Sequence, residues 1–109
     1  MLKGSMLRLM LGGTALFPLL FSTYTFADNG ADVYKARCSA CHGSNGAGET
    51  MLGKNLKLRS LTSDAVQKQS DNELATIISR GKNKMPPFDH KLSKDQIGDV
   101  VKYVRSLKK

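Results

Sequence analysis

The feature that most constrains the fold of this chain is the segment Cys38-Ser39-Ala40-Cys41-His42, which contains the only two cysteines of the 109 residues. In a C-x-x-C-H segment, each thiol can add to one vinyl group of the same haem and form a thioether. The histidine is then held beneath the iron, where its imidazole can coordinate the metal. We therefore predict one covalently bound haem c per chain, with Cys38 and Cys41 as attachment residues and His42 as an axial ligand of the iron.

Three other uses of the cysteine pair have to be weighed. A structural zinc site needs four ligands, whereas the chain offers one cysteine pair and, besides His42, a single further histidine, His90. A thioredoxin-like redox pair is expected in a βαβ context, which the sequence lacks. A plain disulfide would close a loop of two residues and would constrain the unfolded chain very little. These considerations favour haem attachment over the three alternatives.

The start of the chain has the layout of a secretory signal peptide. A basic beginning is followed by an apolar run over residues 9–21 and by a short polar region that ends at Ala27. The run is shorter than the about 20 apolar residues that cross a bilayer, although residues 22–27 could extend it into an uncleaved anchor. We expect a signal peptide over residues 1–27, cleaved after Ala27, and one haem domain over residues 28–109. Export to the periplasm agrees with the motif, because this haem attachment takes place on the outer side of the bacterial membrane.

The remainder of the chain shows helical patterns and no strand pattern longer than a few residues. The first helix is predicted over residues 30–40 and leads directly into the cysteines. Three glycines within residues 43–48 exclude a regular element there. A short helix capped by Thr62 or Ser63 is expected to extend through Gln67.

Two capping boxes mark the longer helices of the second half. Ser70 and Glu73 begin one helix, which is predicted to end at a left-handed Gly81. Ser93 and Gln96 begin the last helix. Its apolar stripe consists of Ile97, Val100, Val101, Val104 and Leu107. The predicted fold class is therefore all-α, with three to five short helices wrapped around one haem.

A haem iron bound by one histidine has a sixth position, for which Met85 is the leading candidate. Met85 lies in a segment without helical periodicity, and the two prolines that follow it stiffen the backbone. Met51, in a glycine-rich loop, lies too soon after His42 to give the chain much length for crossing to the other face of the ring. His90 is a weaker alternative, since most such histidines are solvated. Taken without the haem, Met85 would be read as a gap-filling core residue. We expect the cysteines to face a cavity opposite Met85.

With the motif in place, nearly all of residues 28–109 resembles a small class I cytochrome c. Gly30, Tyr34 and Cys38 match the glycine, aromatic residue and first cysteine of that family, spaced four apart. The resemblance implies that this helix crosses the last helix, where the glycine allows close contact. Val100 and Tyr103 match the aliphatic and aromatic positions of the partner helix.

Two further segments carry the resemblance, and a third departs from it. Gly81-Lys82-Asn83-Lys84-Met85-Pro86-Pro87-Phe88 is similar to the methionine-ligand loop of the family. The segment that begins at Leu92-Ser93 is similar to the tail of the short photosynthetic and bacterial members. Many members have a proline whose carbonyl accepts a hydrogen bond from the ligand histidine, whereas this chain has Lys54 in the comparable stretch. The carbonyl of Lys54 could still accept that bond.

The resemblance implies a soluble periplasmic electron carrier, a monomer that is not an enzyme and exchanges electrons with redox protein partners. The alternative is a haem c protein with a displaceable sixth ligand, acting as a small peroxidase or gas-binding site. A further variant is an electron-transfer subunit of a larger oxidoreductase. A chain of this size is at the margin for a stable core. We therefore expect the haem to supply core and the apoprotein to be poorly folded.

The charge of the chain suggests how partners are met. The net charge is +8, and it becomes +6 when one lysine and one arginine leave with the signal peptide. Lys82 and Lys84 lie in the expected ligand loop, just before Met85. Further basic residues lie on the last helix and tail: Lys102, Arg105, Lys108 and Lys109. A basic rim can steer the protein toward an acidic docking surface, or it can be a solvated face that maintains solubility. Nucleic-acid binding is not expected of an exported haem protein. By their position in the chain, Arg59 and Asn55 are candidate partners of the haem propionates.

Overall fold

The computed structural model describes residues 12–15, 18 and 29–108. The predicted signal peptide over residues 1–27, apart from 12–15 and 18, and its cleavage point after Ala27 lie outside the described residues. Within the part of the chain that the structure describes, no helix is long and apolar enough to cross a bilayer.

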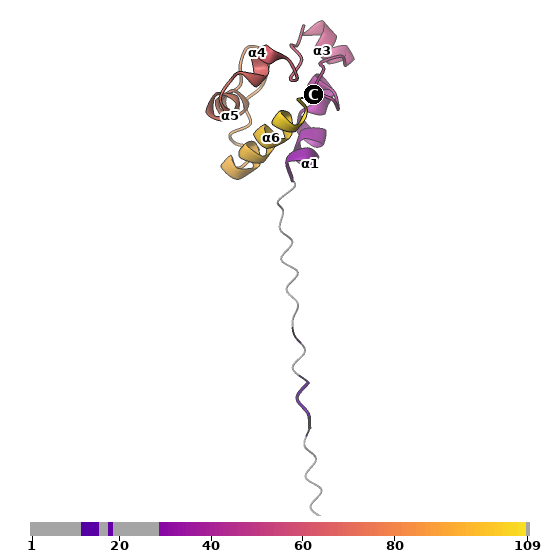
Figure 1. The fold of residues 1–109 in the computed structure, drawn as a ribbon, viewed down its shortest axis with the longest axis vertical. Helices are drawn as coiled ribbons and strands as arrows, with labels where there is room; N and C mark the ends of the chain where they lie inside the picture. The colour runs from indigo at the N-terminus through magenta and orange to yellow at the C-terminus, as the bar shows by residue number, and fades with distance from the viewer. Residues whose placement is uncertain (1–11, 16–17, 19–28, 109) are drawn as a thin grey trace, which may run out of the picture.

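The described residues form six helices and one isolated β-bridge, between Lys82 and Met85 (Figure 1). The helices are α1 (Asn29–Arg37), α2 (Ser39–His42), α3 (Met51–Asn55), α4 (Asp64–Gln67), α5 (Asp71–Arg80) and α6 (Lys94–Ser106). The predicted all-α fold class is confirmed, but the described residues form six helices rather than three to five, because the first helix is divided at Cys38 and a capped turn forms at α3. Glycines interrupt the chain between α2 and α3, and a glycine and two prolines lie between α5 and α6.

Helices α1 and α6, the first and the last of the described helices, lie side by side (Figure 1). A Cβ atom on Gly30 would overlap the backbone carbonyl of Asp99, so only glycine permits this approach. Tyr34 of α1 and Val100 of α6 are each 1 % exposed. The rings of Tyr34 and Tyr103 lie 4.9 Å apart and tilted, an arrangement that aromatic pairs prefer. The helix crossing that the resemblance implied is therefore present.

At the beginnings of several helices, backbone N–H groups donate hydrogen bonds to side-chain oxygens. Both predicted capping boxes are confirmed. At α5 the Ser70 hydroxyl accepts from the N–H of Glu73, whose carboxylate accepts from the N–H of Ser70, and Ser93 starts α6 in the same way. Of the two candidate caps for the short helix, Ser63 is the one used, since its hydroxyl accepts from the N–H of Val66.

Three local details differ from the predictions. The helix predicted over residues 30–40 is interrupted at Cys38, whose φ of −116° separates α1 from α2. Residues around Met51, expected in a glycine-rich loop, form α3, because the Thr50 hydroxyl caps it by accepting from the N–H of Gly53 at 2.9 Å. Gly81 has the expected positive φ of 75°, but its ψ of 170° is extended, because the chain turns at once into the next loop.

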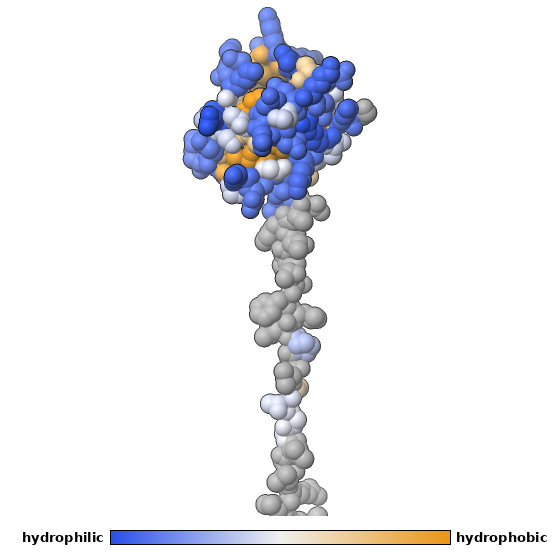
Figure 2. Space-filling view, turned by 60° about the vertical axis from the view of Figure 1, so that its left-hand side comes forward, coloured by the Kyte–Doolittle hydropathy of each residue, from blue (hydrophilic) through white to orange (hydrophobic). Residues whose placement is uncertain are grey.

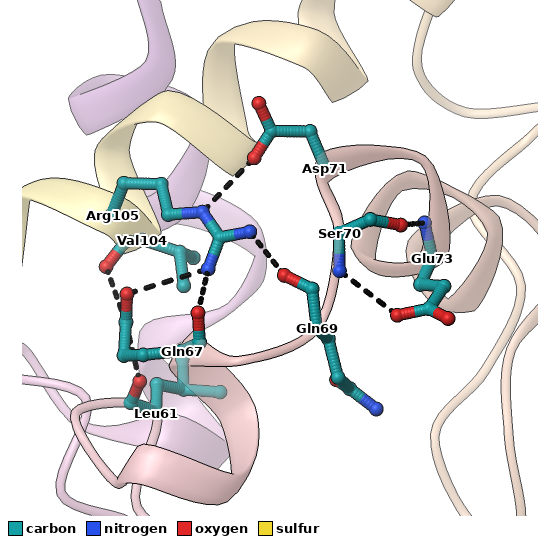
Figure 3. A network of polar contacts seen from close by, with 8 residues as sticks. All are labelled: Leu61, Gln67, Gln69, Ser70, Asp71, Glu73, Val104 and Arg105. Atoms are coloured by element: carbon teal, nitrogen blue, oxygen red, sulfur yellow. Dashed lines mark hydrogen bonds and ion pairs between the residues drawn. The ribbon is translucent and has the colours of Figure 1, made fainter.

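A polar network joins the segment between α4 and α5 to α6 (Figure 3). The guanidinium of Arg105 donates to the carbonyls of Gln67 (2.8 Å) and Gln69, and its Nε lies 2.9 Å from a carboxylate oxygen of Asp71. The amide of Gln67 donates in turn to a backbone carbonyl of α6 at 3.3 Å. Arg105, predicted as part of a basic rim, is thus committed to holding the chain together.

The buried core is small and lies mainly between α5, α6 and the loop that joins them. Its members are Tyr34, Val66, Leu74, Ile78, Phe88, Leu92, Ile97, Val100, Val101 and Val104. Figure 2 shows one face of the domain, on which apolar surface appears in areas enclosed by hydrophilic side chains. Ten buried side chains are few for a domain of this size, which agrees with the expectation that a ligand completes the core.

Candidate haem site

A cavity of about 520 Å³ lies between α1, α2, the loop after α5, and α6. This volume is in the range that holds a medium-sized organic ligand. Most of its lining is apolar, contributed by Leu56, Leu58, Leu61, Val66, Leu74, Ile77, Ile78, Phe88, Val100, Val101 and Val104. Several of these side chains also belong to the core. The cavity therefore reaches into the core and also opens to the surface.

Both cysteines of the motif line this cavity and are free thiols. The turn that carries them is closed by backbone bonds, since the N–H of Cys38 donates to Tyr34 at 2.8 Å and the N–H of His42 donates to Cys38 at 3.0 Å. Burial, and next the neighbouring Cys41, raise the pKa of the Cys38 thiol to about 11. Among the described residues, no three His, Cys, Asp or Glu side chains come close enough to hold a metal ion, so the zinc alternative has no ligand set there.

His42 lines the same cavity. Its Nδ1 atom is buried and makes no hydrogen bond with the described residues. Burial lowers the pKa of the imidazole, so the ring is neutral at pH 7, and the neutral form is the one that binds a metal. A buried nitrogen without a partner is rare in proteins and points to a missing ligand or acceptor.

The acceptor expected for His42 is not in place. The carbonyl of Lys54 instead accepts a bond from the N–H of Lys57 at 3.1 Å, because Lys54 lies in the last turn of α3. The carbonyl of Lys54 does not also accept from His42, because Nδ1 of His42 makes no hydrogen bond with the described residues.

Met85 also lines the cavity, whereas the two competing ligands do not. Met51 is 82 % exposed at the start of α3. His90 is exposed, and its Nδ1 lies 2.5 Å from a carboxylate oxygen of Asp89. The structure therefore gathers Cys38, Cys41, His42 and Met85 around one space, as the sequence led us to expect, and leaves the two competitors outside it.

The charged residues that line the cavity are all basic: Arg37, Lys57, Arg59, Lys82 and Lys84. Arg59, a predicted propionate partner, is among them, but Asn55 is not. Sequence reasoning missed Arg37 and Lys57, although the position of Arg37 directly before the first cysteine was a usable signal. A lining with basic side chains and no Asp or Glu fits a ligand that is apolar over most of its surface and carries carboxylates. The residues present therefore fit a haem.

Comparison with known proteins decides the family. Residues 25–104 match the family described as "Cytochrome C oxidase, cbb3-type, subunit III". Cytochrome c6 from Nostoc sp. (strain PCC 7120) is 32 % identical over 99 residues, which cover 88 % of this chain and 86 % of that protein. The chain belongs to the class I c-type cytochromes.

Solved structures agree with this assignment. The KustC0563 c-type cytochrome superposes with a TM-score of 0.68 at 34 % identity, over 73 % of this chain and 98 % of that one. Cytochrome c6C from Synechococcus sp. PCC 7002 gives a TM-score of 0.58 at 29 % identity, over 72 % and 93 % of the two chains. This cytochrome is accordingly a small haem c protein of electron transfer, with covalently bound haem and iron.

Proposed function

We propose that this cytochrome is a periplasmic electron carrier whose haem iron is held by His42 and Met85, with Cys38 and Cys41 as the thioether attachment residues. The observation that supports the proposal most is the single cavity lined by these four side chains. Neither Met51 nor any other candidate ligand lines it.

The bound haem supplies a one-electron Fe(II)/Fe(III) couple. The neutral imidazole of His42 and the thioether of Met85 would hold the haem iron, and with both bound the iron would offer no position to a substrate. A carrier is the function that suits such a site, and we propose no enzymatic activity. As a soft ligand, the sulfur of Met85 would favour the reduced state and raise the potential relative to two histidines. The mostly apolar lining would limit the water around a bound haem, so that the surroundings of the iron would change little between the two oxidation states.

Charge and sequence support the proposed partners and location. The basic side chains at the cavity favour redox partners with acidic docking surfaces. A signal peptide over residues 1–27, cleaved after Ala27, would export residues 28–109 as a monomeric domain. Cytochromes c6 match this chain over most of its length, and we infer a comparable carrier role here.

The test uses the protein exported in a host that attaches haem c. The mass should equal residues 28–109 plus one haem, and the ferric protein should be low-spin with an Fe–S charge-transfer band. Met85→Ala should abolish this band, while Met51→Ala, at an exposed methionine outside the cavity, should keep it. A high-spin ferric protein whose reduced form readily binds carbon monoxide would instead support the displaceable-ligand alternative.

A second candidate function follows from the matched family, whose description names an oxidase subunit. In that case the domain would transfer electrons while docked permanently on a larger oxidoreductase. Purification from the native cell separates the two, because a carrier elutes alone at the size of residues 28–109, whereas a subunit elutes with its complex.

A further inference from the structure

The loop that carries Met85 begins with a two-residue hairpin. The N–H of Lys82 donates to the carbonyl of Met85 at 3.1 Å, and the N–H of Met85 donates to the carbonyl of Lys82 at 2.9 Å. Asn83 and Lys84 are the central residues. Asn83 has a φ of +54°, and Lys84 is not among the residues with positive φ. Positive φ at the first central position alone is the pattern of a type II′ turn, where glycine is the usual residue.

The hairpin is braced on both sides by α5. The N–H of Gly81 donates to Ile77 at 2.8 Å where the loop begins, and the N–H of Phe88 donates to Ile78 at 3.0 Å where it ends. A Cβ atom on Gly81 would lie 2.5 Å from the carbonyl oxygen of Met85, so the chain passes directly against the hairpin. Both backbone polar groups of Met85 are therefore used, and its side chain leaves from a fixed point.

We propose that Asn83 is a positioning residue that determines how firmly Met85 holds the sixth coordination position. Its positive φ closes the hairpin, and the closed hairpin opposes displacement of Met85 by small ligands. This inference rests on the proposed function, because it takes Met85 as the axial ligand.

The size of the effect follows from backbone sterics. Asparagine tolerates a positive φ, whereas a β-branched residue clashes there and lowers the equilibrium constant for the closed turn by about tenfold. A competing ligand binds only when Met85 has left the cavity. Its apparent affinity is therefore proportional to the fraction of molecules with the loop open. Opening the hairpin about ten times more often should tighten that apparent affinity by about tenfold.

The experiment compares three variants of the ferric holoprotein, with cyanide as the competing ligand. Asn83→Val disfavours the turn, and Asn83→Gly keeps access to positive φ. Ile97→Val is the matched control for lost stability, because Ile97 is 4 % exposed in α6 and does not line the cavity. The measurements are the cyanide dissociation constant, the intensity of the Fe–S band, and hydrogen exchange at the amides of Lys82 and Met85.

In Asn83→Val, cyanide affinity should rise by about tenfold and both amides should lose protection by a similar factor. Asn83→Gly should stay within about threefold of the wild type, and Ile97→Val should leave both quantities unchanged. If Asn83→Val behaves like Ile97→Val, the inference is overturned although the carrier function stands. If the wild type itself lacks the Fe–S band, the proposed His42 and Met85 ligation fails, and this is visible before any variant is made.

Discussion

Replacing Tyr34 with phenylalanine should change the alkaline stability of this cytochrome in a way that follows from one buried hydroxyl. Tyr34 is 1 % exposed, and its hydroxyl donates to the carbonyl of Gly43 at 2.6 Å. Burial is the main reason that its pKa is raised to about 12, with smaller contributions from the neighbouring Cys38 and Tyr103. Because burial dominates, attachment of haem at Cys38 should leave the direction of this shift unchanged.

The sign of the pH dependence follows from proton binding. In the unfolded chain Tyr34 loses its proton near its ordinary pKa of about 10, whereas in the folded protein it keeps the proton until about 12. The unfolded state therefore binds fewer protons in this window, and the free energy of unfolding falls as the pH rises. At pH 11 the ratio of the two proton-binding factors is about ten, which corresponds to a loss of about 1.4 kcal/mol relative to neutral pH.

Phenylalanine at position 34 lacks both the hydrogen bond and the titration. At pH 7 the Tyr34→Phe variant should be less stable than the wild type by about 1 kcal/mol, the usual net contribution of one buried hydrogen bond. By pH 11 the wild type should have lost that advantage, so the two stabilities should meet. Urea titrations of both holoproteins, followed by far-UV circular dichroism from pH 7 to 11, measure this difference. The other titrating groups are the same in both proteins, so their contributions cancel in the difference between the two free energies of unfolding. A difference that stays constant up to pH 11 would refute the assigned pKa of Tyr34.

Three further predictions concern packing and charge. Gly30→Ala should destabilise the protein by more than about 2 kcal/mol, because the added Cβ would overlap the backbone of α6. Gly98→Ala should stabilise α6 by up to about 1 kcal/mol, because nothing lies within 4 Å of the added Cβ and alanine favours a helix. Thermal unfolding compares the two variants, and equal effects would contradict the packing argument. Arg105→Ala should lower the free energy of unfolding in urea by about 2–3 kcal/mol, because it leaves two backbone carbonyls without their donor. A decrease of less than about 0.5 kcal/mol would show that Arg105 is a solvated surface residue. The double variant Lys82→Glu, Lys84→Glu should transfer electrons more slowly to an acidic redox partner at low salt, and its transfer rate should no longer depend on salt. Stopped-flow kinetics measure this rate. If its salt dependence is unchanged, these lysines do not steer the partner.

Several elements were predictable because their signals are short-range. The capping boxes at Ser70 and Ser93 join residues three apart, so the sequence specifies them almost completely. The segment from Cys38 to His42 is similar, since a single turn of chain positions both thiols and the imidazole. The match of Gly30 to the family predicted the close approach of α1 and α6, which the overlap of its Cβ with the Asp99 carbonyl explains.

Other features depended on contacts that no local pattern contains. Helix α1 ends at Arg37 because of the φ value of Cys38. Helix α3 depends on the Thr50 hydroxyl, which caps it and also donates to the carbonyl of Cys41 at 2.8 Å. The Lys54 carbonyl is used inside its own helix turn, which a comparison with the family could not reveal. The sequence predicts Arg105 as a surface charge, whereas the fold brings its guanidinium to two backbone carbonyls.

The sequence by itself determined the chemistry of this protein, namely two thiols and an imidazole within five residues, an all-α chain, and a basic charge. Only the tertiary structure decided which distant residues complete the site. It brings Met85 and Arg59 to the cavity and leaves Met51, His90 and Asn55 outside. The physical reason is that the motif is fixed by neighbouring peptide units, whereas the opposite side of the cavity is assembled by the packing of α5, α6 and the loop between them, which no spacing in the sequence encodes.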